Sequence, residues 1–262
     1  MRLLASDEPP ACLEWNRRGR SSFVIVVDHA SARIPRSLGD LGVPAEELKR
    51  HIAWDIGALA VARRVAAALD AQLVAQNYSR LVIDCNRDPK VASSIPRQSE
   101  RVAIPGNVGL AEAQVAARRR EIFDPYHGHI SALLDERTGA GRPTILVSQH
   151  TMTDVFHGVR RPMHAAVLYN RDRGFAGLVL EALRREPDIV VADNEPYFVS
   201  DATDYSIPHH GERRGLPHVE IEIRQDLVSD ERGQEEWAGR LIRALAASAE
   251  ALGRGGPSPG AG

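Results

Sequence analysis

The sequence predicts a single-domain mixed α/β fold with a mostly parallel sheet and helices on both of its faces. Short runs rich in β-branched residues alternate with helix-length segments along nearly the whole chain. Strands that are separated by helices favour parallel pairing through crossover connections. The chain has 262 residues, 43% of them hydrophobic, and no internal repeat, so one large core is the simplest expectation.

The predicted strands are short apolar runs, of which Phe-Val-Ile-Val-Val at residues 23–27 is the first. The others span residues 72–76, 81–85, 145–148, 165–169, 189–192 and 219–223. The predicted helices have apolar residues at spacings of three and four. They span residues 45–69, 110–136, 175–185 and 230–252, and Pro125 predicts a kink or break in the second.

The same patterns divide the chain into three parts. Residues 1–20 are expected to form an N-terminal segment, and residues 21–252 a single domain. Residues 253–262 are rich in glycine and proline and are expected to be a disordered tail.

Composition argues against several classes of function. A formal net charge of -2 predicts no general affinity for nucleic acid or anionic membranes. The local run Arg118-Arg119-Arg120 is interpreted as a solvated helix face. Two cysteines, Cys12 and Cys85, are too few for a disulfide framework and suit a reducing compartment. The sequence shows no secretory leader and no apolar run that could span a membrane, so we expect a cytoplasmic domain of enzyme size.

Histidines and carboxylates stand where apolar runs end. Asp28-His29 follows the strand at 23–27, His150 follows the strand at 145–148, and Glu222 lies in the strand at 219–223. Side chains at strand ends meet above the sheet in α/β proteins, so this placement predicts a metal-assisted hydrolytic site. The motifs of serine hydrolases, P-loop nucleotide triphosphatases and zinc ribbons are absent from the sequence.

Asp55 falls on the apolar seam of the predicted helix at 45–69. An unpaired carboxylate in a core costs several kcal/mol, so Asp55 needs a cation, an arginine or several hydrogen-bond donors. A metal ion would satisfy it. Alternatively the helix begins late, near Trp54, and Asp55 is an exposed first-turn acid or cap. His51 lies one turn earlier and is a further ligand candidate.

The segment from Ser79 to Pro89 places Arg80, Asn86 and Arg87 at the ends of the strand predicted at 81–85. Guanidinium groups match a carboxylate in a bidentate manner, and an amide adds a further donor, so the segment suits a substrate carboxylate. An ordinary arginine pair that bridges to surface acids is an equal alternative. Cys85 is interpreted as a small buried hydrophobic residue.

The strand at 219–223 alternates strictly. Val219, Ile221 and Ile223 point one way, and Glu220 and Glu222 point the other. Glu222 could therefore face a cleft and transfer protons during amide hydrolysis. An edge strand wetted on one face would show the same pattern.

Five segments resemble N-formylglutamate amidohydrolases: residues 28–35, 51–58, 79–87, 193–197 and 215–227. The resemblance extends over about residues 20 to 245. It implies a zinc-exopeptidase-like (phosphorylase/hydrolase-like) α/β fold and a divalent metal, with zinc expected. It also implies hydrolysis of the N-acyl amide of an acidic amino acid, which for N-formylglutamate yields glutamate and formate.

The resemblance also implies roles for single residues. His29, Asp55 and His150 would bind the metal, and Glu222 would act as general base and acid. Arg80 would stabilise the developing oxyanion, while Asn86 and Arg87 would hold the substrate carboxylate. His210 would reach the substrate, with the adjacent His209 as an alternative.

Two other functions stay open at this point. The first keeps the fold but acts on another N-acyl amino acid or a small cell-wall peptide. The second is a metal- or anion-binding module without catalysis, because one fold supports many activities.

Overall fold

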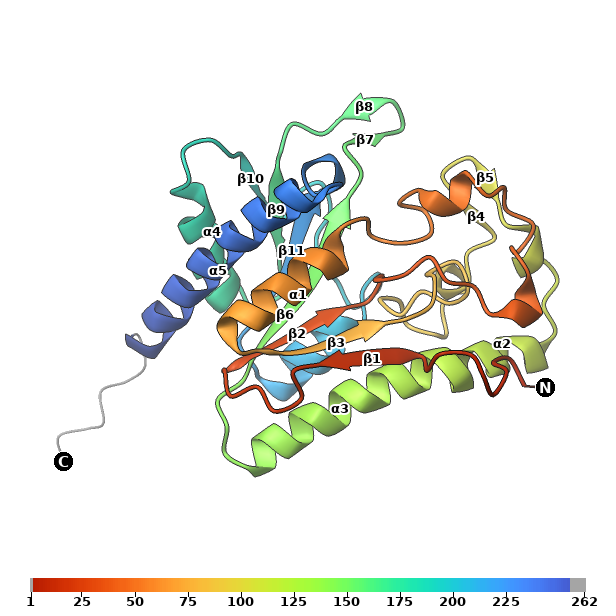
Figure 1. The fold of residues 1–262 in the computed structure, drawn as a ribbon, viewed down its shortest axis with the longest axis horizontal. Coiled ribbons are helices and arrows are strands. Elements are labelled where there is room, and N and C mark those ends of the chain that lie inside the picture. Colours follow the sequence, from red (N-terminus) through yellow and green to blue (C-terminus); the bar gives the residue numbers. More distant parts are fainter. Residues whose placement is uncertain (1, 255–262) are drawn as a thin grey trace.

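The structure is a computed structural model that describes residues 2–254, and it confirms the predicted fold class (Figure 1). One seven-stranded mixed sheet has the order β1-β3-β2-β6-β11-β9-β10. Its strands are β1 (Cys12–Trp15), β2 (Phe23–Val27), β3 (Gln72–Gln76), β6 (Ile145–Met152), β9 (Ala165–Leu168), β10 (Val191–Asp193) and β11 (His218–Arg224). The β1–β3 and β11–β9 pairs are antiparallel, and the other neighbouring pairs are parallel.

Two hairpins lie outside this sheet: β4 (Gln98–Ser99) with β5 (Val102–Ala103), and β7 (Val155–Phe156) with β8 (Val159–Arg160).

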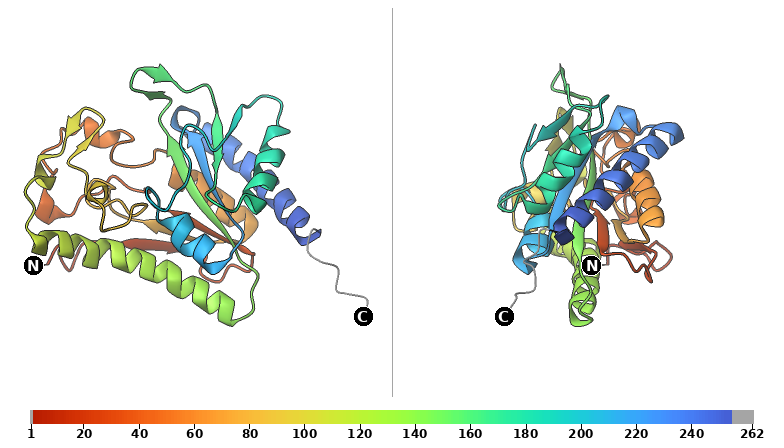
Figure 2. Two further views of the ribbon diagram at one scale, coloured as in Figure 1. Left: turned by 180° about the vertical axis from the view of Figure 1, so that it is seen from behind. Right: turned by 90° about the vertical axis from the view of Figure 1, so that its left-hand side faces the viewer.

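Helices cover both faces of the sheet (Figures 1 and 2). On one face lie α1 (Ala58–Leu69), α4 (Gly174–Arg184) and α5 (Glu231–Arg254). On the other lies α3 (Asp124–Gly139), which follows α2 (Glu112–Arg118) and a π-helical turn at Arg119–Phe123. Single 3-10 or π turns occur at Arg36–Leu38, Glu47–Lys49, Ala92–Ser94, Pro105–Asn107, Ile207–Gly211, Glu212–Arg214 and Gln225–Leu227. No helix within residues 2–254 has both the length and the apolar content to cross a bilayer.

The central strands divide their side chains between two apolar clusters. Ile25 and Val147 pack beneath α1, α4 and α5, whereas Val26 and Leu146 face the side of α3. Burial on both faces accounts for the continuous apolar runs of β2 and β6 in the sequence. Strand β11 differs, since only its odd-numbered residues join the first cluster. It lies between β6 and β9, so the edge-strand alternative is wrong.

The strand predicted at residues 81–85 is wrong, because this segment forms turns. Its backbone groups find partners other than a neighbouring strand. The Asn107 amide donates to the Leu81 carbonyl, Arg118 Nη1 donates to the Val82 carbonyl, and the Asp84 N–H donates to the Ser94 carbonyl. The apolar run is nevertheless buried. The apolar run at residues 81–85 therefore predicted correctly that the segment is buried, but not that it is a strand.

Arg118 corrects the interpretation of the basic run. Its side chain is 1% exposed and also donates to Asn107 Oδ1 at 2.6 Å. Burial lowers the pKa of Arg118 to about 10. Arg119 and Arg120 are exposed, as the solvated-face interpretation requires. Arg118 instead fixes the segment that carries the arginines of the candidate site.

The helix predicted at residues 45–69 begins only at Ala58. Residues 45–57 form turns because the Asp55 N–H donates to the His29 carbonyl and Gly57 adopts a left-handed φ of +81°. The helix predicted at 110–136 is interrupted by the π turn just before Pro125, as the proline suggested.

The two ends of the chain also differ from expectation. Strand β1 was not predicted, and it joins residues of the N-terminal segment to the sheet by pairing with β3. At the other end, residues 253 and 254 belong to α5. The rest of the predicted disordered tail, residues 255–262, lies outside the described residues.

Candidate active site

Three buried side chains from distant segments converge near the carboxyl ends of β2 and β6. His29 follows β2, Asp55 precedes α1, and His150 lies within β6, which runs four residues beyond its predicted end at 148, to Met152. Asp55 Oδ2 lies 2.9 Å from His150 Nδ1 and 3.4 Å from His29 Nδ1. One ligand atom from each residue lies within 4.8 Å of the others. This group could hold a metal ion.

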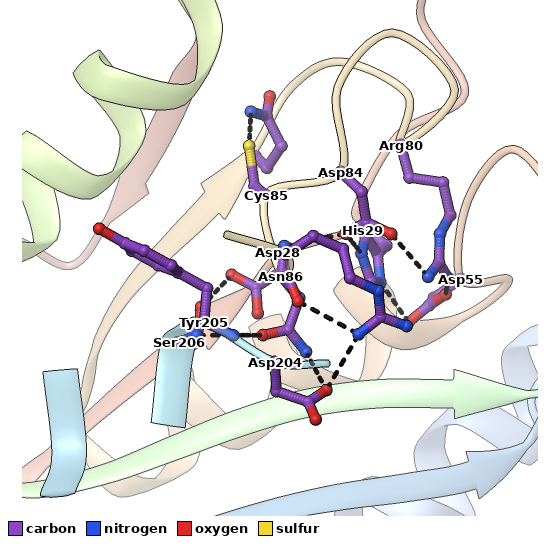
Figure 3. A network of polar contacts seen from close by, with 12 residues as sticks. Asp28, His29, Asp55, Arg80, Asp84, Cys85, Asn86, Asp204, Tyr205 and Ser206 are labelled. Carbon is purple, nitrogen blue, oxygen red and sulfur yellow. Dashed lines mark hydrogen bonds and ion pairs between the residues drawn. The ribbon is translucent and has the colours of Figure 1, made fainter. Parts of the chain in front are cut away.

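The second ring nitrogen of each imidazole, Nε2, contacts acidic or hydroxyl groups on the side away from Asp55. His29 Nε2 lies 2.7 Å from Asp84 Oδ1 (Figure 3). His150 Nε2 lies 3.0 Å from Ser148 Oγ and 3.4 Å from Asp28 Oδ2. A carboxylate behind an imidazole fixes its tautomer and orientation, as it does for many metal-bound histidines. Both Nδ1 atoms are thereby directed at Asp55.

The electrostatics of this group favour a cation. Burial alone would lower the pKa of His29 and His150, but the neighbouring carboxylates outweigh burial and raise both pKa values. Burial likewise opposes ionisation of Asp55, yet the two imidazoles hold its pKa below the ordinary value. The field that attracts a proton to the imidazoles would also attract a divalent ion. Two imidazole nitrogens and one carboxylate oxygen are a donor set that zinc accepts.

Glu222 stands beside this group on the neighbouring strand. Strands β11 and β6 are parallel, and their register pairs Glu222 with His150. The Tyr197 hydroxyl donates to Glu222 Oε1 at 2.8 Å, while Oε2 has no hydrogen-bond partner among the described residues. Burial raises the pKa of Glu222 to about 7. A carboxyl group with this pKa can both accept and return a proton at neutral pH.

These groups open into one cavity of about 800 Å³. The predicted site residues that line it are His29, Asp55, Arg80, Asn86, Arg87, His150 and Glu222. His51 also lines the cavity, but its Nε2 pairs with Glu100 at 3.1 Å, and His51 is not part of the potential ligand group. Of the two ligand candidates that precede α1, the structure therefore brings Asp55 to the imidazoles.

The two arginines of the segment at residues 79–89, the arginine segment, contact acids that line the cavity. Arg80 lies 2.9 Å from Asp84 and 3.4 Å from Asp55, so the alternative of a pair bridging to surface acids does not hold for Arg80 (Figure 3). Arg87 lies 3.2 Å from Asp204. Asn86 Oδ1 accepts hydrogen bonds from the N–H groups of residues 205 and 206, both at 3.0 Å. These two bonds connect the arginine segment to the chain that follows Asp204.

His210 does not line the cavity, so the prediction that it reaches the substrate does not fit its position. The π turn at Ile207–Gly211 directs it inward, where it is 0% exposed and lies 2.9 Å from His127 Nδ1. The alternative, His209, stacks on Tyr205 and does not line the cavity either.

Four residues of the site were missed from the sequence: Asp28, Asp84, Tyr197 and Asp204. Two of them carried a usable signal. Asp84 is a charge within an otherwise apolar run, and Asp28 is buried at the end of an apolar strand next to a candidate ligand. An acid in such a place needs a buried partner. Tyr197 and Asp204 lie in irregular segments, where no periodicity indicates which way a side chain points.

Fold and cavity together describe an α/β protein with a pocket lined by buried charged groups, as enzymes have. Residues 21–229 match the model of the N-formylglutamate amidohydrolase family, and the chain belongs to this family.

Two solved structures share the fold of this chain. A gene product of Agrobacterium tumefaciens has 36% sequence identity and a TM-score of 0.93, over 96% of this chain and 100% of that one. An N-formylglutamate amidohydrolase from Ralstonia eutropha has 18% identity and a TM-score of 0.69, over 94% of this chain and 100% of that one. The second likeness supports the fold alone. No curated protein sequence matches the chain.

Proposed function

We propose that the chain is a metal-dependent amidohydrolase that cleaves the N-formyl, or another N-acyl, amide of an acidic amino acid. With N-formylglutamate the products would be glutamate and formate. One observation carries the proposal: His29, Asp55 and His150 meet in the cavity that Glu222 and Arg87 also line. Membership of the family supports amide hydrolysis. We also propose that residues 21–252 form the catalytic domain, and that the protein is cytoplasmic, which its two free cysteines support.

His29, Asp55 and His150 would hold the metal, which we propose to be zinc. Such an ion, when bound, supplies a Lewis acid that makes water more acidic and polarises a carbonyl oxygen.

Glu222 would transfer the protons. It would accept one proton as water adds to the amide carbonyl carbon, and deliver it to the amine nitrogen as the carbon–nitrogen bond breaks. Arg80 would donate to the oxygen on which negative charge develops, because its guanidinium lines the cavity beside Asp55. Arg87 would bind a substrate carboxylate, with the Asn86 amide as a further donor.

The deciding experiment compares Glu222→Gln with the wild-type enzyme loaded with zinc. We expect the variant to keep its metal and to lose about 10² to 10⁴ in kcat/KM for N-formylglutamate, because glutamine cannot transfer protons. Glu100→Gln is a matched control, since Glu100 lines the same cavity but pairs with Arg50 and His51. A Glu222→Gln rate above a tenth of wild type would remove Glu222 from this role. Metal binding by the wild-type chain without any amidase activity would favour the binding-module alternative.

A further inference from the structure

The cavity has walls of two different kinds. Hairpin β4–β5 contributes the polar side chains of Gln98, Ser99 and Glu100, and the turns before α1 add His51. Hairpin β7–β8 and residues 196–198 contribute Phe156, Val159, Tyr197 and Phe198, which we call the apolar wall. In Figure 1 and in the reversed view of Figure 2, both hairpins project at the upper edge of the molecule, apart from each other.

The apolar wall is unusually exposed. Its side chains are 41% (Phe156), 69% (Val159), 39% (Tyr197) and 63% (Phe198) exposed. Eight large apolar side chains of residues 2–254 are exposed, and these four are half of them. Exposed apolar side chains that gather at one cavity mark a place where an apolar group binds.

Arg161 holds the wall together. Its guanidinium lies 5.2 Å from the centre of the Phe156 ring and 5.4 Å from that of the Tyr197 ring. The same side chain donates to the Thr153 carbonyl at 3.2 Å and is only 9% exposed. A buried cation that contacts two rings joins the hairpin to the segment at 196–198. The apolar surface is therefore formed before any ligand arrives, which lowers the entropic cost of binding.

The wall also begins next to the reacting groups. The Tyr197 hydroxyl contacts Glu222, so an amide bound at Glu222 would lie next to Tyr197, a member of the apolar wall. Arg80 and Arg87 belong to the segment that leads from β3 to the other hairpin. An amino-acid carboxylate directed at these arginines would leave the acyl half of the substrate directed at the apolar wall. A formyl group carries no apolar chain and would leave the wall uncovered.

We propose, on the basis of the function proposed above, that the apolar wall binds the acyl group of the substrate. The preferred substrates are N-acyl amino acids whose acyl chain is apolar and longer than formyl. Burial of such a chain supplies binding free energy that scales with its length, since each fully buried methylene is worth about fourfold in affinity.

The first test measures kcat/KM for N-formyl-, N-acetyl- and N-hexanoylglutamate with the zinc-loaded enzyme. We expect the hexanoyl compound to exceed the acetyl compound by at least about tenfold. Val159→Ser should lower kcat/KM for the hexanoyl compound at least about threefold and leave the formyl compound within about twofold. Val108→Ser is the matched control, because Val108 is 63% exposed, close to the 69% of Val159, and does not line the cavity.

The second test needs no turnover. It compares binding of N-hexylglutamate and N-methylglutamate, which lack the amide carbonyl, by calorimetry. We expect tighter binding and a more negative heat-capacity change for the hexyl compound, with both differences reduced by Val159→Ser. Equal affinities would overturn the proposal even if no substrate is hydrolysed. Faster hydrolysis of the formyl compound, or equal effects of Val159→Ser and Val108→Ser, would also overturn it while leaving the amidohydrolase proposal intact.

Discussion

At the scale of single residues, the site depends on buried charges that stabilise one another. Asp84 accepts a hydrogen bond from His29 and pairs with Arg80, so one carboxylate orients a candidate ligand and a candidate oxyanion donor together. A buried acid is tolerated only with such partners. The sequence singled out the two imidazoles because they follow apolar runs, Asp55 because it interrupts an apolar seam, and Glu222 because it alternates with apolar residues. It missed the contacts of Asp84 because they depend on a turn whose backbone the apolar pattern did not reveal.

We predict that Asp84→Asn weakens metal binding. The variant removes the negative charge behind His29 Nε2 and leaves the shape nearly unchanged. Loss of such a partner costs about 10- to 100-fold in metal affinity. The measurement is zinc affinity by competition with a fluorescent chelator. Asp204→Asn makes the same charge change in the same cavity but contacts Arg87 and Asn86 instead of an imidazole. Equal zinc affinity of the two variants would contradict the role of Asp84.

The acid limb of the pH profile should depend on Tyr197. Burial raises the pKa of Glu222 to about 7, and the Tyr197 hydroxyl opposes this rise because it favours the charged carboxylate. A general base must be ionised, so kcat/KM should fall as pH drops through the pKa of Glu222. We predict that Tyr197→Phe moves this midpoint to higher pH, with a larger loss of activity at pH 6 than at pH 9.

Tyr169→Phe is the control for this measurement. Its hydroxyl also donates to a carboxylate at 2.8 Å, that of Asp193, and Tyr169 does not line the cavity. If Tyr197→Phe and Tyr169→Phe gave the same midpoint, the hydrogen bond to Glu222 would have no part in setting it.

At the scale of elements, the sequence predicted correctly the strands whose apolar pattern arises only from burial in the core. The bounds of β2 and β3 agree with the prediction, because both strands are buried on two faces and end at sharp turns. The helix predicted at 45–69 failed over its first half for a different reason. The spacing of Leu48, Ile52 and Asp55 imitates a helical seam, but the backbone there turns to bring Asp55 to His29. The spacing of apolar residues within one segment does not reveal a contact with a residue as distant in the chain as His29.

Gly57 is where this turn meets α1, and we predict that Gly57→Ala disturbs the site. Its φ is +81°, and an added Cβ would lie 2.4 Å from the Val228 carbonyl oxygen. The backbone at residue 57 would therefore have to move, and this position is only two residues from Asp55 in the chain. We expect a loss of stability of about 2 to 4 kcal/mol, together with weaker zinc binding. Chemical denaturation and zinc titration measure the two effects.

Gly39→Ala separates backbone strain from collision. Gly39 has a φ of +60°, but a Cβ there would meet nothing within 4 Å. We expect a loss of about 1 to 2 kcal/mol and unchanged zinc affinity. A Gly57→Ala protein that behaved like Gly39→Ala in both measurements would show that the position of Asp55 does not depend on this turn.

At the scale of the whole molecule, the sheet brings distant parts of the sequence to one place. Strands β2, β6 and β11 are adjacent and parallel, so His29, His150 and Glu222 meet although they are far apart in the chain. The alternation of strands and helices predicted a parallel sheet, and therefore that strand ends would meet. Neither the order of the strands nor the two hairpins that border the cavity could be predicted, because both depend on contacts between segments that share no local pattern.

This arrangement predicts that metal binding stabilises the entire fold. The three proposed ligands come from the end of β2, the turn before α1 and the middle of β6, so they are held together only in the folded chain. An ion that binds the folded state alone stabilises it by about 2.7 kcal/mol at a free concentration one hundred times Kd. For a chain of this size we expect zinc to raise Tm by about 5 to 10 °C and a chelator to abolish the rise. Asp55→Asn should respond to neither. A wild-type Tm that is the same with zinc and with chelator would mean that the three side chains do not bind zinc as a group.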